Sequence, residues 1–169
     1  HSEPLLSAYF GSGSQYGVDI FYSREEKPLG TVGPISIIPD LPETFLVMNG
    51  DILTTLNYQR LIQYHRRQKG IVTIAMNQKR VPLELGVMEY NRGYRLNRYI
   101  EKPTLSYSVS MGIYLFERKV LEWIPSRKYL DFPELIQKLI KHRRKVICYP
   151  SPIPSHSSLP ILEAGVNMG

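Results

Sequence analysis

The sequence predicts an α/β domain built around a mainly parallel sheet. Residues 45–48 are apolar without alternation, which is typical of a strand buried on both faces at the centre of such a sheet. A segment with helical periodicity runs from Thr55 or Asn57 to Lys69, and residues 71–75 are again apolar, which completes a strand–helix–strand unit. Of the 169 residues, 43% are hydrophobic and 21% charged, as in one globular domain with a core of ordinary size.

The chain is basic, with a formal net charge of +6 and a pI near 9.4, which suits phosphorylated ligands or nucleic acid. Its single cysteine, Cys148, excludes an internal disulfide and favours a reducing, cytoplasmic location. We expect no membrane partner, because no apolar run is long enough to span a bilayer and no signal-peptide pattern opens the sequence. The chain starts at His1, inside a predicted helix, so we expect a fragment or a trimmed product.

Near the N-terminus, residues 3–10 have a helical pattern and residues 17–22 have the pattern of a strand. Residues 11–14, Gly-Ser-Gly-Ser, form a turn-rich loop between them. Such a loop can cradle a phosphate group, but here no strand precedes it and no Lys-Ser/Thr pair follows it. We therefore favour the interpretation as a turn.

Residues 28–33, Pro-Leu-Gly-Thr-Val-Gly, are a first candidate for ligand binding. Gly30 permits the close approach of a backbone, and Thr31 can cap a short helix that runs towards Ile38. The free amides of a helix N-terminus are a natural place for a nucleotide. Alternatively, the segment is only a strand-to-helix turn that ends at Pro39.

Asp51 is a second candidate, because it follows the first buried strand after Asn49 and Gly50 break the apolar run. Open α/β sheets bind ligands at the carboxyl ends of their strands, so this carboxylate is placed to hold Mg²⁺ against a phosphate. The alternative is that Asn-Gly-Asp forms a turn and that Asp51 caps the structure that follows.

The helix that ends near Lys69 is expected to stop at Gly70. Its last turn is basic, and cations there interact favourably with the helix dipole, which explains the cluster without a ligand. His65 shares a face with the apolar residues of this helix. We therefore expect it to be a packed or capping histidine rather than a catalytic base.

Residues 85–100 have the pattern of a hairpin with its turn at Asn91–Gly93, and a further strand is expected at residues 110–116. Lys102 lies between them and is expected to be held extended by Pro103, so that its ammonium group could reach a phosphate. The alternative is an exposed pair of Glu101 and Lys102 that contributes almost nothing to stability.

The C-terminal part predicts a short helix at residues 119–124 and a longer helix capped by Asp131, with Glu134 reaching back. The basic run at residues 141–145 ends this helix. Because no aromatic residues are interleaved with it, we expect no nucleic-acid partner. Residues 146–149 read as a last strand, and residues 151–169 as an irregular, proline-rich tail.

A series of short segments, in order, resembles the sugar-nucleotide pyrophosphorylases, which join a sugar 1-phosphate to a nucleoside triphosphate. The resemblance covers residues 1–150 and leaves 151–169 as the tail. The similar segments are residues 9–20, 27–33, 45–51, 85–87, 101–103, 110–114 and 129–133.

The resemblance implies a three-layer α/β/α Rossmann-like sandwich of the nucleotide-diphospho-sugar transferase type, incomplete and with a mixed, mostly parallel sheet. It implies that Leu29, Gly30 and Thr31 lie near the nucleotide and that Asp51 carries Mg²⁺. The implied partners are a nucleoside triphosphate and a sugar 1-phosphate, and a homo-oligomer stays open.

The resemblance also implies a sugar pocket. Gly86 would lie under the sugar, Glu101 would bond its hydroxyl groups, Lys102 would meet its phosphate, and Gly112 would belong to a strand that lines the pocket. Ser110 stands where the family usually has Asn, which removes one expected sugar contact.

The implied reaction is an in-line attack of a sugar phosphate oxygen on the α-phosphorus, with pyrophosphate as the leaving group. Asp51 and Lys102 are the implied catalytic residues, since Mg²⁺ on the carboxylate and the ammonium group would hold two anions that repel each other. Catalysis of this kind consists mainly of positioning and charge neutralisation.

Two departures from the family pattern predict an impaired enzyme. The Gly-rich signature loop would precede His1, and the tail has no Trp or Asp to supply a second metal carboxylate, Glu163 being its only acid. A non-catalytic regulatory or scaffold relative is therefore a second hypothesis. A nucleotide-sugar-dependent glycosyltransferase is a third, although Asp51 stands without the second acid of an Asp-x-Asp pair. The base and the sugar cannot be read from the residues, which lean towards the guanylyl or general hexose branch.

Overall fold

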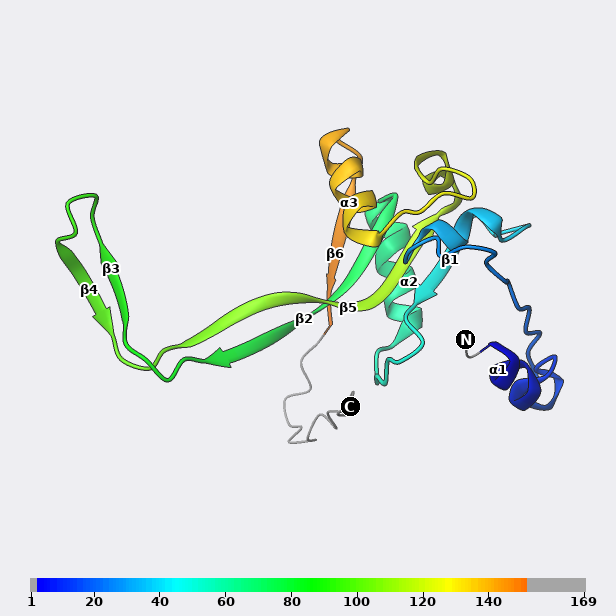
Figure 1. Ribbon diagram of the computed structural model, residues 1–169, viewed down its shortest axis with the longest axis horizontal. Coiled ribbons are helices and arrows are strands. Elements are labelled where there is room, and N and C mark those ends of the chain that lie inside the picture. Colours follow the sequence, from blue (N-terminus) through cyan, green and yellow to red (C-terminus); the bar gives the residue numbers. More distant parts are fainter. Residues whose placement is uncertain (1–2, 152–169) are drawn as a thin grey trace. The chain divides into compact units, whose positions relative to one another are not determined.

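The structure is a computed structural model that describes residues 3–151 (Figure 1). It divides into two compact units. The first comprises residues 3–75 and Gly112–Tyr149, and the second comprises Met76–Met111 with residues 150 and 151. The predicted tail falls almost entirely on residues 152–169, outside the described residues.

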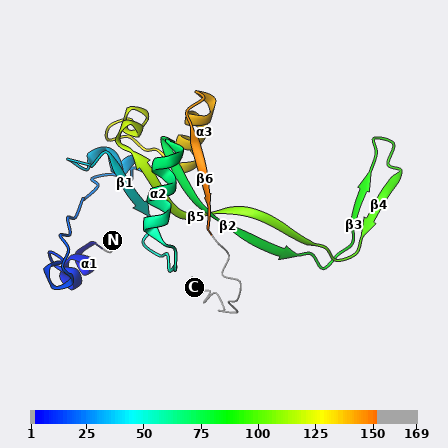
Figure 2. The ribbon, with the colours of Figure 1, turned by 180° about the vertical axis from the view of Figure 1, so that it is seen from behind.

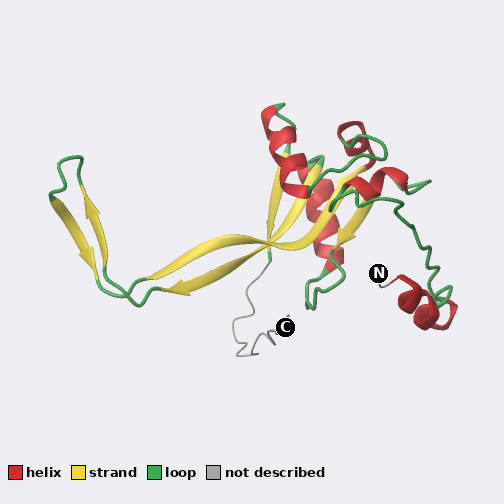
Figure 3. Ribbon diagram, viewed as in Figure 1, coloured by secondary structure: helices red, strands yellow, loops and turns green. Residues whose placement is uncertain are grey.

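A four-stranded sheet in the order β1-β5-β2-β6 forms the centre of the first unit, and β2 and β5 continue into the second (Figure 3). The strands are β1 (Thr44–Met48), β2 (Val72–Pro82), β5 (Thr104–Glu117) and β6 (Val146–Pro150).

The strand directions follow from the backbone hydrogen bonds. β1 is antiparallel to β5, with Thr44 opposite Glu117. Glu117 N–H also donates to Ile71 C=O, and Leu83 N–H donates to Pro103 C=O, so β2 is antiparallel to β5 as well.

β6 runs with β2, because Ile71 N–H donates to Lys145 C=O while Ser151 N–H donates to Met76 C=O. Therefore β1, β2 and β6 share one direction and β5 opposes them. The predicted mixed sheet is confirmed: three of its four described strands share a direction, although only β2 and β6 are paired in parallel.

Successive side chains of β5 point to opposite faces of the sheet, and a helical layer packs on each face. Tyr114 and Phe116 belong to the main hydrophobic core, together with Leu135 and Leu139 of α3 (Phe132–Lys141). Ile113 and Leu115 are buried as well but lie outside that cluster.

The other face of the sheet is covered by α2 (Tyr58–Gln68), from which the buried His65 reaches Thr73 of β2. Views from opposite sides show α3 on one face and α2 on the other (Figures 1 and 2). The three-layer α/β/α sandwich is thereby confirmed.

The N-cap of α2 is Asn57, one of the two residues that the sequence predicted. The Asn57 side chain accepts a hydrogen bond from Arg60 N–H at 2.9 Å. The helix ends at Gln68, one residue earlier than expected, and its C-cap residue Lys69 has φ +53°. Gly70 is needed for packing instead, since a Cβ there would lie 2.5 Å from Ile147 Cδ1. No helix within residues 3–151 has both the length and the apolar character to cross a lipid bilayer.

The position of β1 corrects one expectation. The apolar run was predicted to be a central strand buried on both faces, but β1 is at the edge of the described sheet and pairs only with β5. Phe45 is buried, whereas Leu46 and Met48 are 42% and 44% exposed. An apolar run shows that a strand forms but does not give the number of its neighbours.

The strand predicted at residues 17–22 is wrong. The N-terminal part contains α1 (Glu3–Phe10), as predicted, and a short 3₁₀ helix, η1 (Ser14–Tyr16), but residues 18–25 are irregular. Phe21 is 91% exposed. A strand requires a neighbouring strand for its backbone groups, and this segment pairs with none among the described residues. Two of the other predicted short helices are 3₁₀ helices: η2 (Gly33–Ile37) and η3 (Arg118–Trp123).

The second unit contains the predicted hairpin, made of β3 (Val87–Tyr90) and β4 (Leu96–Ile100). Its turn is organised by Asn91, whose Oδ1 accepts hydrogen bonds from Gly93 N–H at 2.9 Å and Arg95 N–H at 3.1 Å. A side chain that bonds the backbone a few residues ahead is the ordinary reason for asparagine in such a turn.

Candidate functional site

The predicted site residues fall into three groups in the structure. Leu29, Gly30 and Thr31 form a loop, and Asp51 lies in a turn that packs on Gly112; both groups belong to the first unit. The third group, in the second unit, contains Gly86, Glu101 and Lys102.

The loop of residues 29–31 is fixed by hydrogen bonds on both sides of Gly30. Leu29 is buried; its N–H donates to Glu25 Oε2 at 2.7 Å and its C=O accepts from Leu130 N–H at 2.9 Å. Thr31 donates to Asp131 Oδ1 twice, through its N–H at 3.0 Å and its hydroxyl group at 3.2 Å. The loop is therefore held in one shape before any ligand arrives.

Gly30 has φ +78°, and a Cβ at this position would lie 2.6 Å from Leu130 O and 2.9 Å from Asp131 Oδ1. The predicted close approach of a backbone is confirmed, but the backbone is the chain's own. The expectation of free amides is wrong for Val32 and Gly33, whose N–H groups both donate to Leu130 C=O. Within residues 3–151, the N–H and C=O of Gly30 itself take part in no hydrogen bond.

Thr31 and Asp131 each cap differently from the prediction. Asp131 is the N-cap residue of α3, but its side chain bonds no helix amide. Thr31 Oγ1 instead accepts from Phe132 N–H, at 2.7 Å, from a distance of 101 residues along the chain. The helix that follows Thr31 begins after Val32 and has no side-chain cap. Capping rules consider local partners, and here the partners are distant in sequence.

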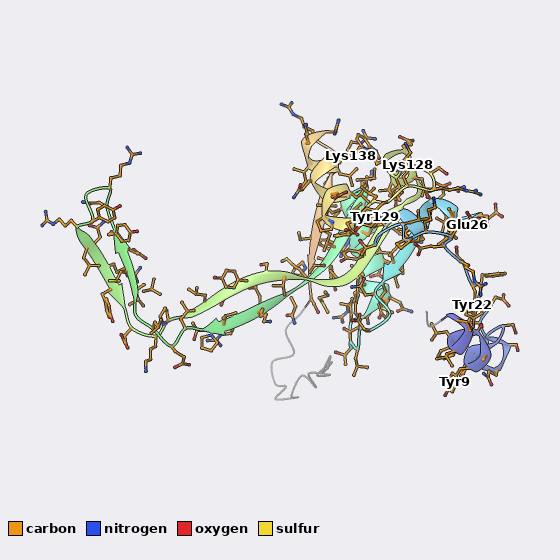
Figure 4. All side chains as sticks on the ribbon, in the orientation of Figure 1. Tyr9, Tyr22, Glu26, Lys128, Tyr129 and Lys138 are labelled. Carbon is orange, nitrogen blue, oxygen red and sulfur yellow. The ribbon has the colours of Figure 1, made fainter. Side chains whose placement is uncertain are left out.

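Asp131 was predicted only as a cap, and the structure gives it a larger role. The Tyr129 hydroxyl donates to its Oδ2 at 2.5 Å (Tyr129 is labelled in Figure 4). Hydrogen bonds from Tyr129 and from Thr31 N–H lower the pKa of Asp131, and Asp131 raises the pKa of the Tyr129 hydroxyl. Both groups therefore keep their ordinary charge at neutral pH.

A cavity of about 970 Å³ lies beside this loop. Its wall includes Leu29, Lys27 and Arg127, and Figure 4 labels Tyr22 and Glu26 among the residues that line it. Its volume lies within the range of pockets that hold small molecules.

Asp51 lies just beyond the carboxyl end of β1, as predicted, and is exposed. The turn that carries it is attached to β5, because Asn49 N–H donates to Gly112 C=O at 3.0 Å. Gly112 has φ +69°, and a Cβ there would lie 2.7 Å from Ile52 Cδ1 and 2.8 Å from Asn49 Nδ2. Gly112 therefore sets the position of the turn that carries Asp51. No cluster of His, Cys, Asp or Glu large enough to hold a metal ion by itself occurs in the described part of the chain.

In the second unit, Tyr99 joins two predicted sugar-binding residues. A Cβ on Gly86 would lie 2.1 Å from Tyr99 Oη, so the ring occupies the space that a side chain at residue 86 would take. The Tyr99 hydroxyl donates to Glu101 Oε2 at 2.9 Å. Sequence reasoning missed Tyr99, although residues two apart near a strand lie on the same face and this could have indicated it.

Lys102 has φ +42°, which corrects the expectation that Pro103 holds it extended. A following proline disfavours the right-handed helical region but does not exclude the left-handed one. Residues 101–103 connect β4 to β5, which belong to different sheets.

Residues 1–153 match the nucleotidyl transferase family. The chain belongs to this family. The nucleotidyl transferases similar to it include the mannose-1-phosphate guanylyltransferase catalytic subunit beta of Drosophila pseudoobscura pseudoobscura, which is 36% identical over 114 residues, 64% of this chain and 31% of the relative. The UTP–glucose-1-phosphate uridylyltransferase of Synechocystis is 33% identical over 162 residues, 80% of this chain and 41% of the relative. The chain thus spans about two fifths or less of these curated relatives.

Solved structures show the same fold. The crystal structure of HddC from Yersinia pseudotuberculosis matches with a TM-score of 0.59 and 20% identity, covering 86% of this chain and 64% of HddC. HddC in complex with GMP-PN matches with a TM-score of 0.59 and 18% identity, covering 88% and 65%. The predicted fold class is that of these solved structures.

Proposed function

We propose that this chain carries part of the catalytic domain of a sugar-1-phosphate nucleotidyltransferase. Such an enzyme joins a hexose 1-phosphate to a nucleoside triphosphate and releases pyrophosphate. The family match over residues 1–153 carries the proposal. Relatives named for mannose 1-phosphate and for glucose 1-phosphate support the two substrate classes. The single Cys148 supports a cytoplasmic location.

The nucleotide would bind at the loop of residues 29–31. Gly30 offers an N–H and a C=O without a hydrogen-bond partner in the described residues, between neighbours that are fixed by Glu25 and Asp131. Backbone groups of this kind recognise the edge of a base, because they present a donor and an acceptor in a fixed direction. The adjacent cavity is lined by Lys27 and Arg127, which would meet the phosphates, although Glu25, Glu26 and Asp40 line it as well.

Asp51 fits a magnesium site of one particular kind. Mg²⁺ is often held by one or two carboxylates, with water and substrate phosphates completing its six oxygen ligands. The exposed carboxylate of Asp51 fits this arrangement, and the described residues offer no preassembled cage of protein ligands. When bound, the ion would neutralise charge on the triphosphate. Asp51 would be held at the end of β1 for this purpose, because the hydrogen bond from Asn49 N–H to Gly112 C=O fixes its turn.

The sugar 1-phosphate would bind in the second unit. Gly86 and Tyr99 would form the surface under the sugar, and the Glu101 carboxylate, held by the Tyr99 hydroxyl, would accept hydrogen bonds from sugar hydroxyl groups. Lys102 would meet the sugar phosphate with its ammonium group. Gly112 would contribute indirectly, by placing the turn of Asp51.

The reaction requires little covalent chemistry from the protein. A phosphate oxygen of the sugar 1-phosphate forms a bond to the α-phosphorus, and the bond from that phosphorus to the β-phosphate oxygen breaks. Pyrophosphate leaves with the electron pair, and no proton needs to be removed from an ionised phosphate. Lys102 would neutralise charge on the phosphate of the sugar 1-phosphate.

Pyrophosphate release tests the proposal. Four nucleoside triphosphates are combined with glucose 1-phosphate and mannose 1-phosphate in the presence of Mg²⁺, with this chain and with a chain extended upstream. We expect one nucleotide and one sugar to be preferred. Asp51→Asn and Lys102→Met should lower turnover by at least about tenfold, because each removes a charge that acts on the phosphates. Lys69→Met, at the end of α2, is the matched control and should leave turnover unchanged.

The two chains separate the competing hypotheses. Turnover only by the extended chain supports a nucleotidyltransferase of which this sequence is a part. If neither chain turns over and neither binds a nucleoside triphosphate, the proposal fails. If both bind a nucleotide without turnover, the non-catalytic regulatory relative is favoured instead.

A further inference from the structure

The loop of residues 29–31 owes its shape to a segment 100 residues further along the chain. Leu130 closes the contact from its backbone: its N–H donates to Leu29 C=O at 2.9 Å, and its C=O accepts from Val32 N–H at 3.1 Å and Gly33 N–H at 3.2 Å. These three bonds fix where the two segments meet. They leave the conformation between Leu29 and Val32 to be set by side chains.

Asp131 supplies those side-chain bonds, and both of its oxygens are used. Oδ1 accepts from the N–H and the hydroxyl group of Thr31, and Oδ2 accepts from the Tyr129 hydroxyl. Hydrogen bonds to a charged acceptor are stronger than those between neutral groups. Because these bonds also lower the pKa of Asp131, the carboxylate stays ionised at neutral pH.

A simple helix cap would not need this arrangement. Asp131 stands at the N-cap position of α3 and could accept from the helix amides itself, as aspartate does at many helices. Thr31 Oγ1 takes that role instead and accepts from Phe132 N–H. The carboxylate is thereby directed to the loop and the hydroxyl group to the helix. The exchange adds hydrogen bonds to the loop. The helix gains one side-chain cap bond, as a local cap would also have provided.

Gly30 shows what the exchange achieves. Its φ of +78° lies in the left-handed region, and Leu130 O and Asp131 Oδ1 occupy the space where a Cβ would be. No side chain can therefore stand at residue 30. The N–H and C=O of Gly30 make no hydrogen bond within the described residues, while Asp131 bonds the next residue and holds the loop in place.

We infer that Asp131, supported by Tyr129, is a positioning residue for nucleotide binding, which acts by holding Thr31 so that the peptide groups of Gly30 face the nucleotide. This inference rests on the proposed function. Asp131 itself does not touch the nucleotide. Its removal should weaken nucleotide binding, whereas a sugar 1-phosphate should bind as before.

The experiment compares Asp131→Ala, Asp131→Asn and Tyr129→Phe with the matched control Glu134→Gln, an exposed acid in the first turn of the same helix. GTP affinity is measured by calorimetry, and exchange of the Thr31 amide hydrogen by NMR. Asp131→Ala should weaken GTP binding about tenfold and accelerate Thr31 exchange at least as much, since it removes hydrogen bonds to a charged group. Asp131→Asn keeps one acceptor oxygen and should restore part of both. Glu134→Gln should change neither.

The pH dependence of GTP binding provides a readout that a merely structural role would not move. GTP affinity should fall when Asp131 is protonated. Because the Tyr129 hydroxyl lowers the pKa of Asp131, this fall should begin at a higher pH in Tyr129→Phe than in the unaltered chain. Titration of the nucleotide phosphates is common to both proteins and cancels in the comparison. Tyr129 is exposed, so this variant should fold even if Asp131→Ala does not.

The outcomes are distinct. If Asp131→Ala binds GTP within twofold of the unaltered chain while Thr31 exchange is accelerated, Asp131 holds the loop without serving the nucleotide, and the inference is wrong. Unchanged Thr31 exchange would also overturn it. If the unaltered chain binds none of the four nucleoside triphosphates, the proposed function fails first, and the inference fails with it.

Discussion

His65 Nε2 lies 2.8 Å from Glu117 Oε1, and its Nδ1 lies 2.7 Å from Thr73 Oγ1. The ring is 1% exposed and connects α2 to two neighbouring strands of the sheet. Thr44, on β1, donates to the same Glu117 oxygen at 2.9 Å. The buried histidine therefore joins the helix to two strands, and Glu117 extends the network to β1. This agrees with the prediction of a packed histidine.

Replacing His65 should destabilise the chain strongly. His65→Ala leaves a cavity and removes the partners of Thr73 and Glu117, which should lower the free energy of unfolding by about 2–4 kcal/mol. His142→Ala is the control: His142 is exposed, and its loss should change stability by less than about 1 kcal/mol. Urea unfolding followed by circular dichroism measures both. Equal effects of the two substitutions would contradict a central role for His65.

Glu117 should make stability depend on pH. Partial burial raises its pKa, but hydrogen bonds from His65 and Thr44 and the charges of His65 and Lys119 outweigh burial, so that the pKa is lowered overall. A lowered pKa means that the stabilisation is present above the ordinary glutamate pKa of 4.5 and is lost as the pH falls through the folded-state value.

The test compares the unaltered chain with Glu117→Gln. The glutamine variant should be less stable at pH 7, and its stability should fall less between pH 6 and pH 3, because the titrating group is gone. Thermal unfolding over this range measures the slope. Parallel slopes for the two proteins would show that other carboxyl groups, Asp131 among them, account for the acid sensitivity.

Gly86→Ala should change ligand binding more than stability. The new Cβ would collide with the end of the Tyr99 side chain, which is 57% exposed and can swing into solvent. We therefore expect a loss of less than about 1 kcal/mol in unfolding free energy, together with release of Glu101 and about tenfold weaker binding of the sugar 1-phosphate. Calorimetry with glucose 1-phosphate and mannose 1-phosphate measures the binding.

A double variant isolates the collision. Tyr99→Phe removes the hydroxyl group and keeps the ring, so this single substitution should weaken sugar binding. Combined with Gly86→Ala it should add little further loss, because both substitutions act on the same contact. Additive losses would indicate that Gly86 and Tyr99 act independently.

Gly112 and Gly17 separate backbone conformation from packing. Their φ values are +69° and +70°, but only at Gly112 would a Cβ meet other atoms within 4 Å. Gly17→Ala should cost about 1 kcal/mol for the left-handed conformation alone, and Gly112→Ala about 1–3 kcal/mol more. Urea unfolding of both variants gives the difference. A smaller effect at Gly112 would mean that the turn carrying Asp51 shifts freely.

The sequence predicted features whose partners are local. The Asn57 cap and the Asn91 turn involve bonds over two to four residues, and both were found where expected. Thr31 and Asp131 obey the same preferences, but each bonds residues 100 or 101 positions away, and no local rule can choose that partner. The strand at residues 17–22 was wrong for a related reason, since a strand depends on a neighbour that its own residues do not specify.

For the candidate site, residue types were predictable and supporting contacts were not. Asp51 lies at the strand end that its position after an apolar run indicated. The reasons why Gly30, Gly86 and Gly112 are glycines became visible only with the neighbours that would collide with a side chain. Tyr99 and Asp131 are two of those neighbours. The spacing of Tyr99 and Glu101 could have indicated the first, whereas only the folded chain shows that Asp131 bonds Thr31.

Lys102 is subject to two opposing demands. At φ +42° glycine has the lowest conformational energy and asparagine the next lowest. A lysine at this position therefore does not maximise the stability of the chain. If all amino acids are tested at this position, the residue that gives the highest thermal stability should therefore differ from the residue that gives the most product. If lysine is favoured only in the test for product formation, its ammonium group, and not the conformation of the turn, is the reason for a lysine at this position.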